Sequence, residues 1–427
     1  MEEKLALNGG TPVKTTKNIP MYPGGMEIGE EEKKAVMEVL DRKYIFRYYG
    51  PEEYPSKVKE FEELFAKRWG RKHALGLTSC TASLITAMTA AGVGPGSEVI
   101  IPSYTFNATC NAVLNAKAIP VICEIDDSLT MAPDDLEKKI TERTKAIVPV
   151  HMRGVPCDMD KIMEIAQKHN IVVIEDVAQA IGGKYKGRLL GSIGDIGCFS
   201  LQYHKIITSG EGGVLITDND LFYHRAQNYH DAAACWRADR FAPEEFPGEL
   251  FPGVNYRMNE ITGAIALVQI GKLNGLISRM QSLKNRIKNQ ISEIEELAFR
   301  RLNDEEGDTA ICLIISVENA EKAEIFAESL KAEGVAAGSV LNKGVPDWHV
   351  YTHWRHLHDK VTATSEGCPY KCPYYKGPEP EYTPDSCPNT NKHLEKTIHI
   401  DIPPQMTDED ADLIAKAIRK VANVILI

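Results

Sequence analysis

The stretch NIVVIED, at residues 170–176, is a short apolar run that ends on two carboxylates. Runs of the same kind lie on both sides of it: EVIIPS (98–103), AIPVICEI (118–125), KAIVPVH (145–151), GCFSL (197–201) and GGVLITD (212–218). A short apolar run bounded by turn residues is typical of a strand that is buried on both faces of a sheet. Helical patterns such as DMDKIMEIAQKHN separate several of these runs. The sequence therefore predicts the α/β class, with a central, mostly parallel sheet.

Outside this region the pattern changes. Two helical patterns fill much of residues 26–70, separated by the aromatic loop RKYIFRYYGPEEYP, and one long helical pattern runs from 258 to 297. Strands and helices are mixed after residue 300. We therefore predict an N-terminal arm (1–25), a large α/β domain (26–260) and a smaller C-terminal α+β domain (261–427) with an irregular insert rich in Trp, His, Tyr, Pro and Cys (342–393).

Composition limits the classes of function. The chain has 427 residues, 43% of them hydrophobic and 26% charged, which is ordinary for a soluble globular protein. Its formal net charge of −11 argues against a nucleic-acid partner. No uninterrupted apolar run reaches the roughly 18 residues of a membrane span, and the N-terminus is polar, so we expect a cytoplasmic protein without a membrane partner. The ten cysteines are mostly isolated in apolar segments, which favours free thiols.

Groups suited to cofactor binding follow the predicted strands. Asp176 lies at the carboxyl end of its strand, where open α/β sheets bind ligands, and a carboxylate there is suited to pair with a pyridine nitrogen. A helix cap is the alternative role for this aspartate. Residues 78–92, TSCTASLITAMTAAG, place hydroxyl groups at a helix start, which suits phosphate binding or plain capping. Phe106 also follows a strand, where it stacks on a flat ring or packs in the core.

Lys205 is the residue among these candidates that is able to form a covalent bond with a cofactor. It lies in CFSLQYHKIITSGEGGVLITD (198–218), in a tight loop between two predicted strands, five residues after Ser200. A lysine in such a loop forms an imine with an aldehyde when its surroundings lower its pKa. An exposed loop lysine is the alternative, but the joint occurrence of all four features favours an enzyme that holds pyridoxal 5′-phosphate (PLP) on Lys205 as a Schiff base.

The chain resembles, nearly end to end, the DegT/StrS family of PLP-dependent sugar aminotransferases. The motifs that carry the resemblance are PVHMRGVPCDMD, VVIEDVAQAIG, FSLQYHKIITSGEGG and NYRMNEITGAIAL. The resemblance implies the aspartate aminotransferase fold (PLP fold type I). It also implies a transfer of an amino group from L-glutamate or L-glutamine to a keto or aldehyde sugar. The chain departs from the family at Cys80, where the family usually has Gly.

The resemblance also implies roles for individual residues. Lys205 is the implied Schiff-base lysine and proton carrier, and Asp176 the implied partner of the pyridine nitrogen. The other implied cofactor contacts are Phe106 (ring stacking), Gln179 (phenolic oxygen), and Thr81, Ala82 and Ser200 (phosphate). Asn255 is implied to reach the phosphate in a neighbouring subunit, and this implies a homodimer with shared active sites.

Two alternatives remain at this point. A dehydratase branch of the family carries His in place of the lysine; Lys205 favours transamination, although His204 stands beside it. A non-catalytic regulator that binds PLP or a sugar is the other alternative, and the intact Lys205, Asp176 and Gln179 argue against it.

The insert points to a substrate. DWHVYTHWRHL (347–357) in the insert, together with KYIFRYYG near the start of the chain, resembles the branch that aminates C8 of an eight-carbon sugar acid, a 3,8-dideoxy-octulosonate. The candidate cations for an acidic sugar are Arg47, His349, His353 and Arg355, and a packed aromatic loop is the alternative. Cys368, Cys372 and Cys387 raise the question of zinc, but their spacing matches no common zinc site, so we expect free thiols and no metal.

Overall fold

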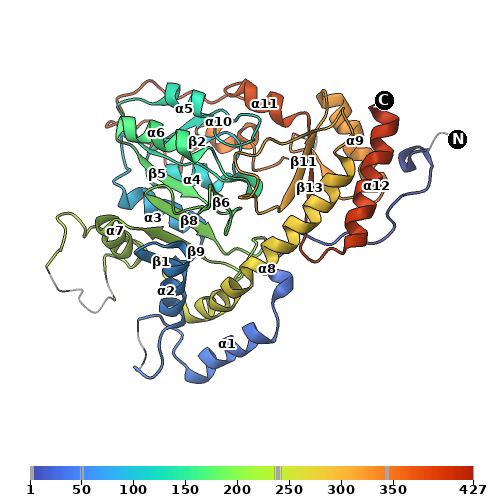
Figure 1. The fold of residues 1–427 in the computed structure, drawn as a ribbon. Helices are drawn as coiled ribbons and strands as arrows, with labels where there is room; N and C mark the ends of the chain where they lie inside the picture. The colour runs from blue at the N-terminus through green and yellow to red at the C-terminus, as the bar shows by residue number, and fades with distance from the viewer. Residues whose placement is uncertain are drawn as a thin grey trace.

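The structure is a computed structural model that describes residues 4–48, 50, 52–234, 236, 241, 243–341 and 346–426. Within these residues the strands form a seven-stranded sheet, a four-stranded sheet and a two-stranded ribbon. A long helix runs from one sheet towards the other (Figure 1). The first residues of the predicted insert, 342–345, and the first three residues of the predicted arm lie outside the described residues.

The seven-stranded sheet is built from the apolar runs of the sequence. Its strands are β1 (His73–Leu77), β2 (Glu98–Pro102), β3 (Ile119–Cys123), β4 (Thr144–Ile147), β5 (Val172–Asp176), β8 (Ile196–Ser200) and β9 (Gly213–Thr217). They are ordered β1-β9-β8-β5-β4-β2-β3, and β9 alone among them runs antiparallel to its neighbours. The prediction of a mostly parallel sheet is confirmed. Because β1 and β8 both run antiparallel to β9, the carboxyl ends of six strands lie at one edge.

Helices cover this sheet and complete its connections (Figure 1). They are α3 (Cys80–Ala90), α4 (Ala108–Asn115), α5 (Pro133–Lys139), α6 (Met159–His169) and α7 (Asp220–His230). The ribbon consists of β6 (Lys184–Tyr185) and β7 (Arg188–Leu189), and short 3₁₀-helices occur at Ala6–Asn8, Gly25–Glu27, Met152–Gly154 and Tyr351–His353. The strands that α3 and α4 follow, β1 and β2, end at the edge where the site forms.

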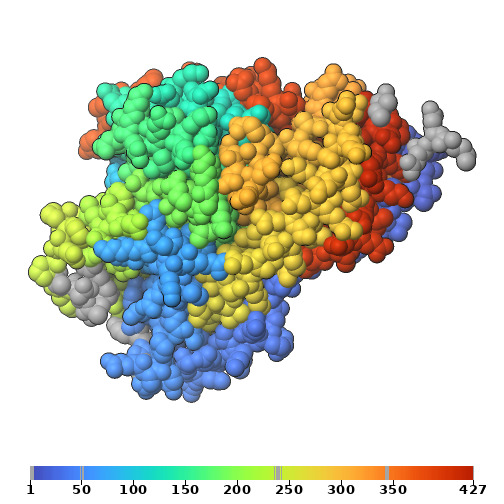
Figure 2. Space-filling view, in the orientation of Figure 1, coloured from blue at the N-terminus to red at the C-terminus, as the bar shows by residue number. Residues whose placement is uncertain are grey.

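Helix α8 (Glu260–Ile291) connects the two halves of the chain. Asn259 caps its start by accepting a hydrogen bond from the backbone N–H of Thr262 at 3.0 Å. Helices α1 (Glu30–Arg42) and α2 (Lys57–Trp69) pack along its first half, and α12 (Asp408–Ile425) packs along its second. By length and composition alone α8 is able to cross a membrane, but these contacts bury one of its faces as in a core helix. Figure 2 shows α8, in yellow, lying between blue N-terminal and red C-terminal segments.

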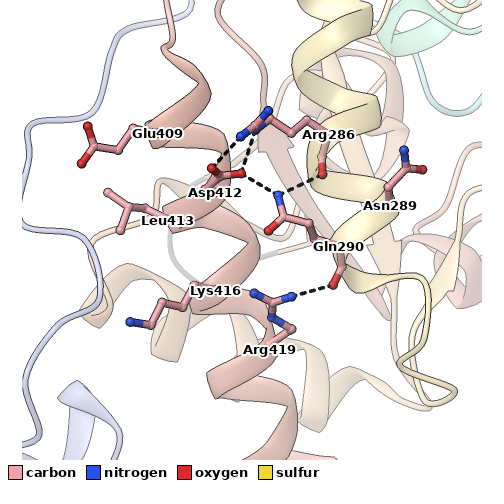
Figure 3. A pocket seen from close by; sticks show the side chains of 8 residues that line it. All are labelled: Arg286, Asn289, Gln290, Glu409, Asp412, Leu413, Lys416 and Arg419. Atoms are coloured by element: carbon pink, nitrogen blue, oxygen red, sulfur yellow. Dashed lines mark hydrogen bonds and ion pairs between the residues drawn. The ribbon is translucent and has the colours of Figure 1, made fainter.

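The antiparallel four-stranded sheet has the order β10-β11-β13-β12. Its strands are β10 (Ala298–Phe299), β11 (Cys312–Ser316), β12 (Ala337–Gly338) and β13 (Thr397–Asp401). Helix α9 (Ala320–Ala332) packs on this sheet, and α12 packs against α9. Between α8 and α12 lies a shallow surface groove (Figure 3). There Arg286 pairs with Asp412 at 2.7 Å, and the N–H of Arg419 donates to the Gln290 carbonyl at 3.1 Å. These polar contacts link the two helices at the surface.

The insert returns to the seven-stranded sheet. It contains α10 (Arg355–His358) and α11 (Pro388–Leu394) among turns. The Tyr382 hydroxyl donates to the Pro120 carbonyl of β3 at 2.7 Å, and the Tyr351 N–H donates to the Ser103 carbonyl at 2.9 Å. The Thr105 N–H donates to the His349 carbonyl at 2.9 Å. The start of the insert is therefore held directly beside the loop that follows β2.

Candidate active site

A cavity of about 810 Å³ opens at the carboxyl edge of the parallel strands. Loops after β2, β4, β5 and β8 contribute to its wall, as does the start of α3, and Pro20 to Pro23 cover it from the N-terminal arm. Asp401 at the end of β13 and Ile311 belong to the other half of the chain. The predicted site residues that line the cavity are Thr81, Phe106, Asp176, Gln179, Ser200, Lys205 and His349.

Lys205 lies in the tight loop after β8. Its N–H donates to the Gln202 carbonyl at 2.9 Å, and its own carbonyl accepts from the Gly24 N–H at 3.3 Å. The N-terminal arm, to which Gly24 belongs, therefore helps to hold this loop in place. Burial lowers the pKa of Lys205, because desolvation disfavours the ammonium form. Asp176 acts in the opposite direction without reversing that shift. The lysine is therefore more easily deprotonated than a surface lysine.

Asp176 is buried at the end of β5. One carboxylate oxygen accepts from the Thr109 hydroxyl at 2.9 Å, and the other accepts from the Ala178 N–H at 3.0 Å. Burial raises the pKa of Asp176, and these two hydrogen bonds and the charge of Lys205 oppose that rise. The aspartate caps a turn rather than a helix, so its carboxylate is oriented by the sheet and by α4.

The start of α3 forms one end of the cavity. Ser79 caps the helix, with its hydroxyl accepting the Ala82 N–H at 3.1 Å, and Thr81 follows in the first turn. The backbone N–H groups of a first helical turn lack partners within the helix and favour an anion. A Cβ at Gly213 would lie 2.3 Å from the Ser79 carbonyl oxygen, so glycine is required where β9 passes this helix start. Ser200, at the end of β8, completes this wall.

Phe106 and Gln179 lie on other walls. Phe106 is 45% exposed, which leaves much of its ring accessible, and its centroid is 5.2 Å from the His349 ring. The Gln179 side-chain oxygen accepts the Arg153 N–H at 3.0 Å. The Asp347 carboxylate, 2.7 Å from Nδ1 of His349, fixes that ring in turn.

Five of the predicted residues do not line this cavity. Arg47 is buried and forms an ion pair with Glu62 at 2.8 Å. The Arg355 side chain is 90% exposed and pairs with Asp359, and Nδ1 of His353 lies 2.9 Å from the Asp347 carbonyl. Asn255 is exposed on another part of the surface, where its side-chain oxygen accepts the Arg257 N–H at 3.3 Å. Ala82 lies in the first turn of α3 beside Thr81 but does not itself line the cavity.

Sequence reasoning missed Arg153 and Asp401. Arg153 stands in the motif PVHMRGVPCDMD, which was recognised as a motif but gave no residue role. Its φ of 55° places it in the left-handed region, and its guanidinium pairs with Asp401 at 2.9 Å. A charged residue inside an otherwise apolar strand-end loop was the available signal for Arg153. Nothing in the local pattern of TIHIDI marks Asp401, because its place depends on how the two sheets meet.

The insert also holds the three cysteines that raised the question of zinc. Cys372 and Cys387 are buried and Cys368 is exposed, and all three are free thiols. Among the described residues, no group of three or more His, Cys, Asp or Glu side chains is placed to hold a metal ion.

Comparison with known proteins agrees with this geometry. Residues 26–372 match the model of the DegT/DnrJ/EryC1/StrS aminotransferase family. The chain belongs to this family. The spore coat polysaccharide biosynthesis protein SpsC of Bacillus subtilis (strain 168) is 31% identical over 404 residues, which cover 93% of this chain and 95% of SpsC. Among solved structures, the aminotransferase from Psychrobacter cryohalolentis is 26% identical, with a TM-score of 0.76 over 94% of this chain and 98% of its own.

Membership of the DegT/DnrJ/EryC1/StrS family fixes the reaction class. The chain is a PLP-dependent sugar aminotransferase with the PLP fold type I, as the resemblance predicted. The Spr1654 protein of Streptococcus pneumoniae, solved in its PLP form, is 25% identical, with a TM-score of 0.76 over 96% of this chain and 100% of its own. The cavity fits this cofactor: it has an anion-binding helix start, an accessible aromatic ring, a buried carboxylate and a lysine of lowered pKa.

Proposed function

We propose that this aminotransferase uses Lys205 to bind PLP covalently and moves an amino group from L-glutamate or L-glutamine to a keto or aldehyde sugar. The observation that carries the proposal is that Lys205, whose pKa is lowered by burial, lines the same cavity as the buried carboxylate of Asp176. When bound, PLP withdraws electrons from the substrate carbon that carries the amino group. Nζ of Lys205 would take the proton from that carbon and deliver it to the cofactor, and in the opposite half-reaction would carry a proton from the cofactor to the acceptor carbon.

The other cavity residues position the cofactor. Asp176 would pair with the pyridine nitrogen and favour its protonated form, because its carboxylate is buried and held in place by Thr109 and Ala178. Phe106 would stack on the ring and Gln179 would contact the phenolic oxygen. Thr81, Ala82 and Ser200, at the start of α3 and the end of β8, would bind the phosphate.

The proposal extends to the assembly. Asn255 is exposed and outside this chain's cavity, which suits a residue that reaches the phosphate in a neighbouring subunit. The enzyme is therefore a homodimer with shared sites. We also propose that it works in the cytoplasm, and that the chain divides into an arm (1–25), a large domain (26–260) and a small domain (261–427).

The proposed acceptor is an eight-carbon sugar acid. The motif DWHVYTHWRHL, which resembles that branch, places His349 on the cavity wall beside Phe106. His353 and Arg355 of the same motif, and Arg47, have other partners and do not line the cavity. Support from this motif therefore rests on His349.

The test is an absorption spectrum of the protein with PLP, before and after L-glutamate, for wild type and Lys205→Ala. Lys186→Ala, at an exposed lysine, is the matched control. We expect a band of covalently bound cofactor in wild type and control, loss of that band on adding L-glutamate, and no such band in Lys205→Ala. A wild-type band that neither L-glutamate nor L-glutamine changes would contradict the proposal and favour a dehydratase or a non-catalytic regulator.

A further inference from the structure

Arg153 lines the cavity but has no part in the chemistry proposed above. It lies in the 3₁₀-turn Met152–Gly154, directly after the segment that follows β4. Its backbone adopts a left-handed conformation, with φ of 55° and ψ of 38°, and its N–H is anchored to Gln179 at 3.0 Å. This backbone conformation is unfavourable for a residue with a side chain, so the fold holds Arg153 in place at a cost.

The guanidinium of Arg153 has N–H groups that donate to no acceptor among the described residues. Its side chain is 23% exposed, and Nη2 donates to Asp401 at 2.9 Å. Nε is buried without a hydrogen-bond partner in the part of the chain that the structure describes. A guanidinium offers several N–H groups in one plane, and Asp401 accepts from only one of its nitrogens. A poorly solvated cation with unused planar donors, at the wall of a substrate cavity, is suited to a planar anion.

The rest of the cavity limits what that anion is. The start of α3 and Ser200 already form an anion-binding end on another wall. At the Arg153 wall, Asp401 balances part of the positive charge and would repel a dianionic phosphate more strongly than a carboxylate. The His349 ring, fixed by Asp347 at 2.7 Å, stands at the same cavity and offers a second polar contact.

We propose that Arg153 binds a carboxylate of the substrate through its guanidinium and thereby determines which substrates the site accepts. The inference rests on the proposed function, because it places the substrate in the cavity beside Lys205. The carboxylate belongs to the amino donor, to an acidic sugar acceptor, or to both in turn, since both half-reactions use one cavity. A purely structural role, in which Arg153 only ties its loop to Asp401 of β13, is the competing explanation.

The experiment measures binding rather than turnover, by calorimetry on the protein in its pyridoxamine phosphate form, which has no aldehyde to react with L-glutamate. Two pairs of probes differ in their carboxylates: L-glutamate against its diamide, and D-glucuronate against D-glucose. The second member of each pair has no carboxylate and is called the neutral member. The variants are Arg153→Gln and Arg153→Lys. Arg286→Gln is the matched control, because Arg286 is also paired with an aspartate but lies in the α8–α12 groove.

We expect wild type to prefer the charged member of at least one pair. Arg153→Gln should weaken binding of that member by roughly 10- to 100-fold, with the neutral member unchanged. Arg153→Lys, which keeps the charge but loses the planar donors, should lie between the two. The pair that responds identifies whether the carboxylate belongs to the donor, the acceptor or both.

Two results would overturn the proposal. One is a wild type that prefers neither charged probe, and the other is an Arg153→Gln variant that weakens charged and neutral probes equally, as a structural role predicts. If Arg153→Gln does not fold, Arg153→Lys carries the same comparison. Failure of the proposed function is distinguishable, because it appears as a wild-type cofactor band that no amino donor changes, whatever the probes bind.

Discussion

Asp176 and Thr109 meet beneath the cavity through a hydrogen bond of 2.9 Å between two buried side chains. Replacing Asp176 with Asn removes the charge that faces the cofactor nitrogen, so we expect kcat/KM to fall by roughly 100- to 1,000-fold. Thr109→Val keeps the carboxylate and its contact with Ala178, so we expect a loss of only about tenfold. Steady-state kinetics with L-glutamate measures both. Equal losses for the two variants would mean that orientation, not charge, is what Asp176 supplies.

The pKa of Lys205 leads to a second prediction at the same scale. Burial lowers this pKa, so the neutral amine that attacks PLP becomes available at a lower pH than for an ordinary lysine. The rate at which the apoprotein recombines with PLP should rise with pH and level off below the ordinary lysine pKa. The charge of Asp176 raises the pKa of Lys205 and the charge of Arg153 lowers it. Asp176→Asn should therefore shift the profile to lower pH and Arg153→Gln to higher pH; shifts in one common direction would contradict this.

Among the elements, the loop before α2 is fixed by the pair of Arg47 and Glu62. Both side chains are at most 10% exposed, and Glu62 also accepts the Gly76 N–H of β1 at 2.6 Å. Arg47→Met leaves a buried carboxylate unpaired, so we expect a loss of about 3–5 kcal/mol in the free energy of unfolding. Adding Glu62→Gln should restore part of that loss, as denaturant titration will show. Normal stability combined with weaker substrate binding would instead place Arg47 at the substrate.

The strands and loops also show which parts of the fold and of the site were predictable from the sequence. Strands buried on both faces leave continuous apolar runs, so β2 to β5 and β8 were recognisable from the sequence, whereas their order in the sheet comes from the structure. Asp176, Phe106 and Lys205 were predictable as neighbours because each follows a strand end at one edge. The partner of Arg47 was not predictable, because the sequence around an arginine in an aromatic motif does not tell whether its side chain contacts a substrate or a buried glutamate. Arg153 was missed because its position in the cavity depends on a left-handed backbone turn and on an ion pair with an aspartate of the other sheet.

At the scale of the whole molecule, the cavity lies where the two halves of the chain meet. The seven-stranded sheet supplies Lys205 and Asp176, while Asp401 comes from the four-stranded sheet and Pro20 to Pro23 come from the arm. Helix α8 packs on α2 in one half and on α12 in the other, and so connects the two halves of the chain. Arg153, proposed to select substrate, follows a strand of the same sheet as the cofactor groups, and its ion-pair partner Asp401 comes from the other half.

The homodimer gives the last prediction. If Asn255 serves the neighbouring subunit, Lys205→Ala and Asn255→Ala homodimers are each impaired, but a mixed dimer contains one site with both residues intact. Refolding the two variants together at equal concentrations should therefore restore roughly a quarter of wild-type activity, because about half of the dimers are mixed and each has one good site. The control refolds each variant alone. If Asn255 acts within its own chain, every site in the mixture lacks one of the two residues, and activity stays at the average of the separate variants.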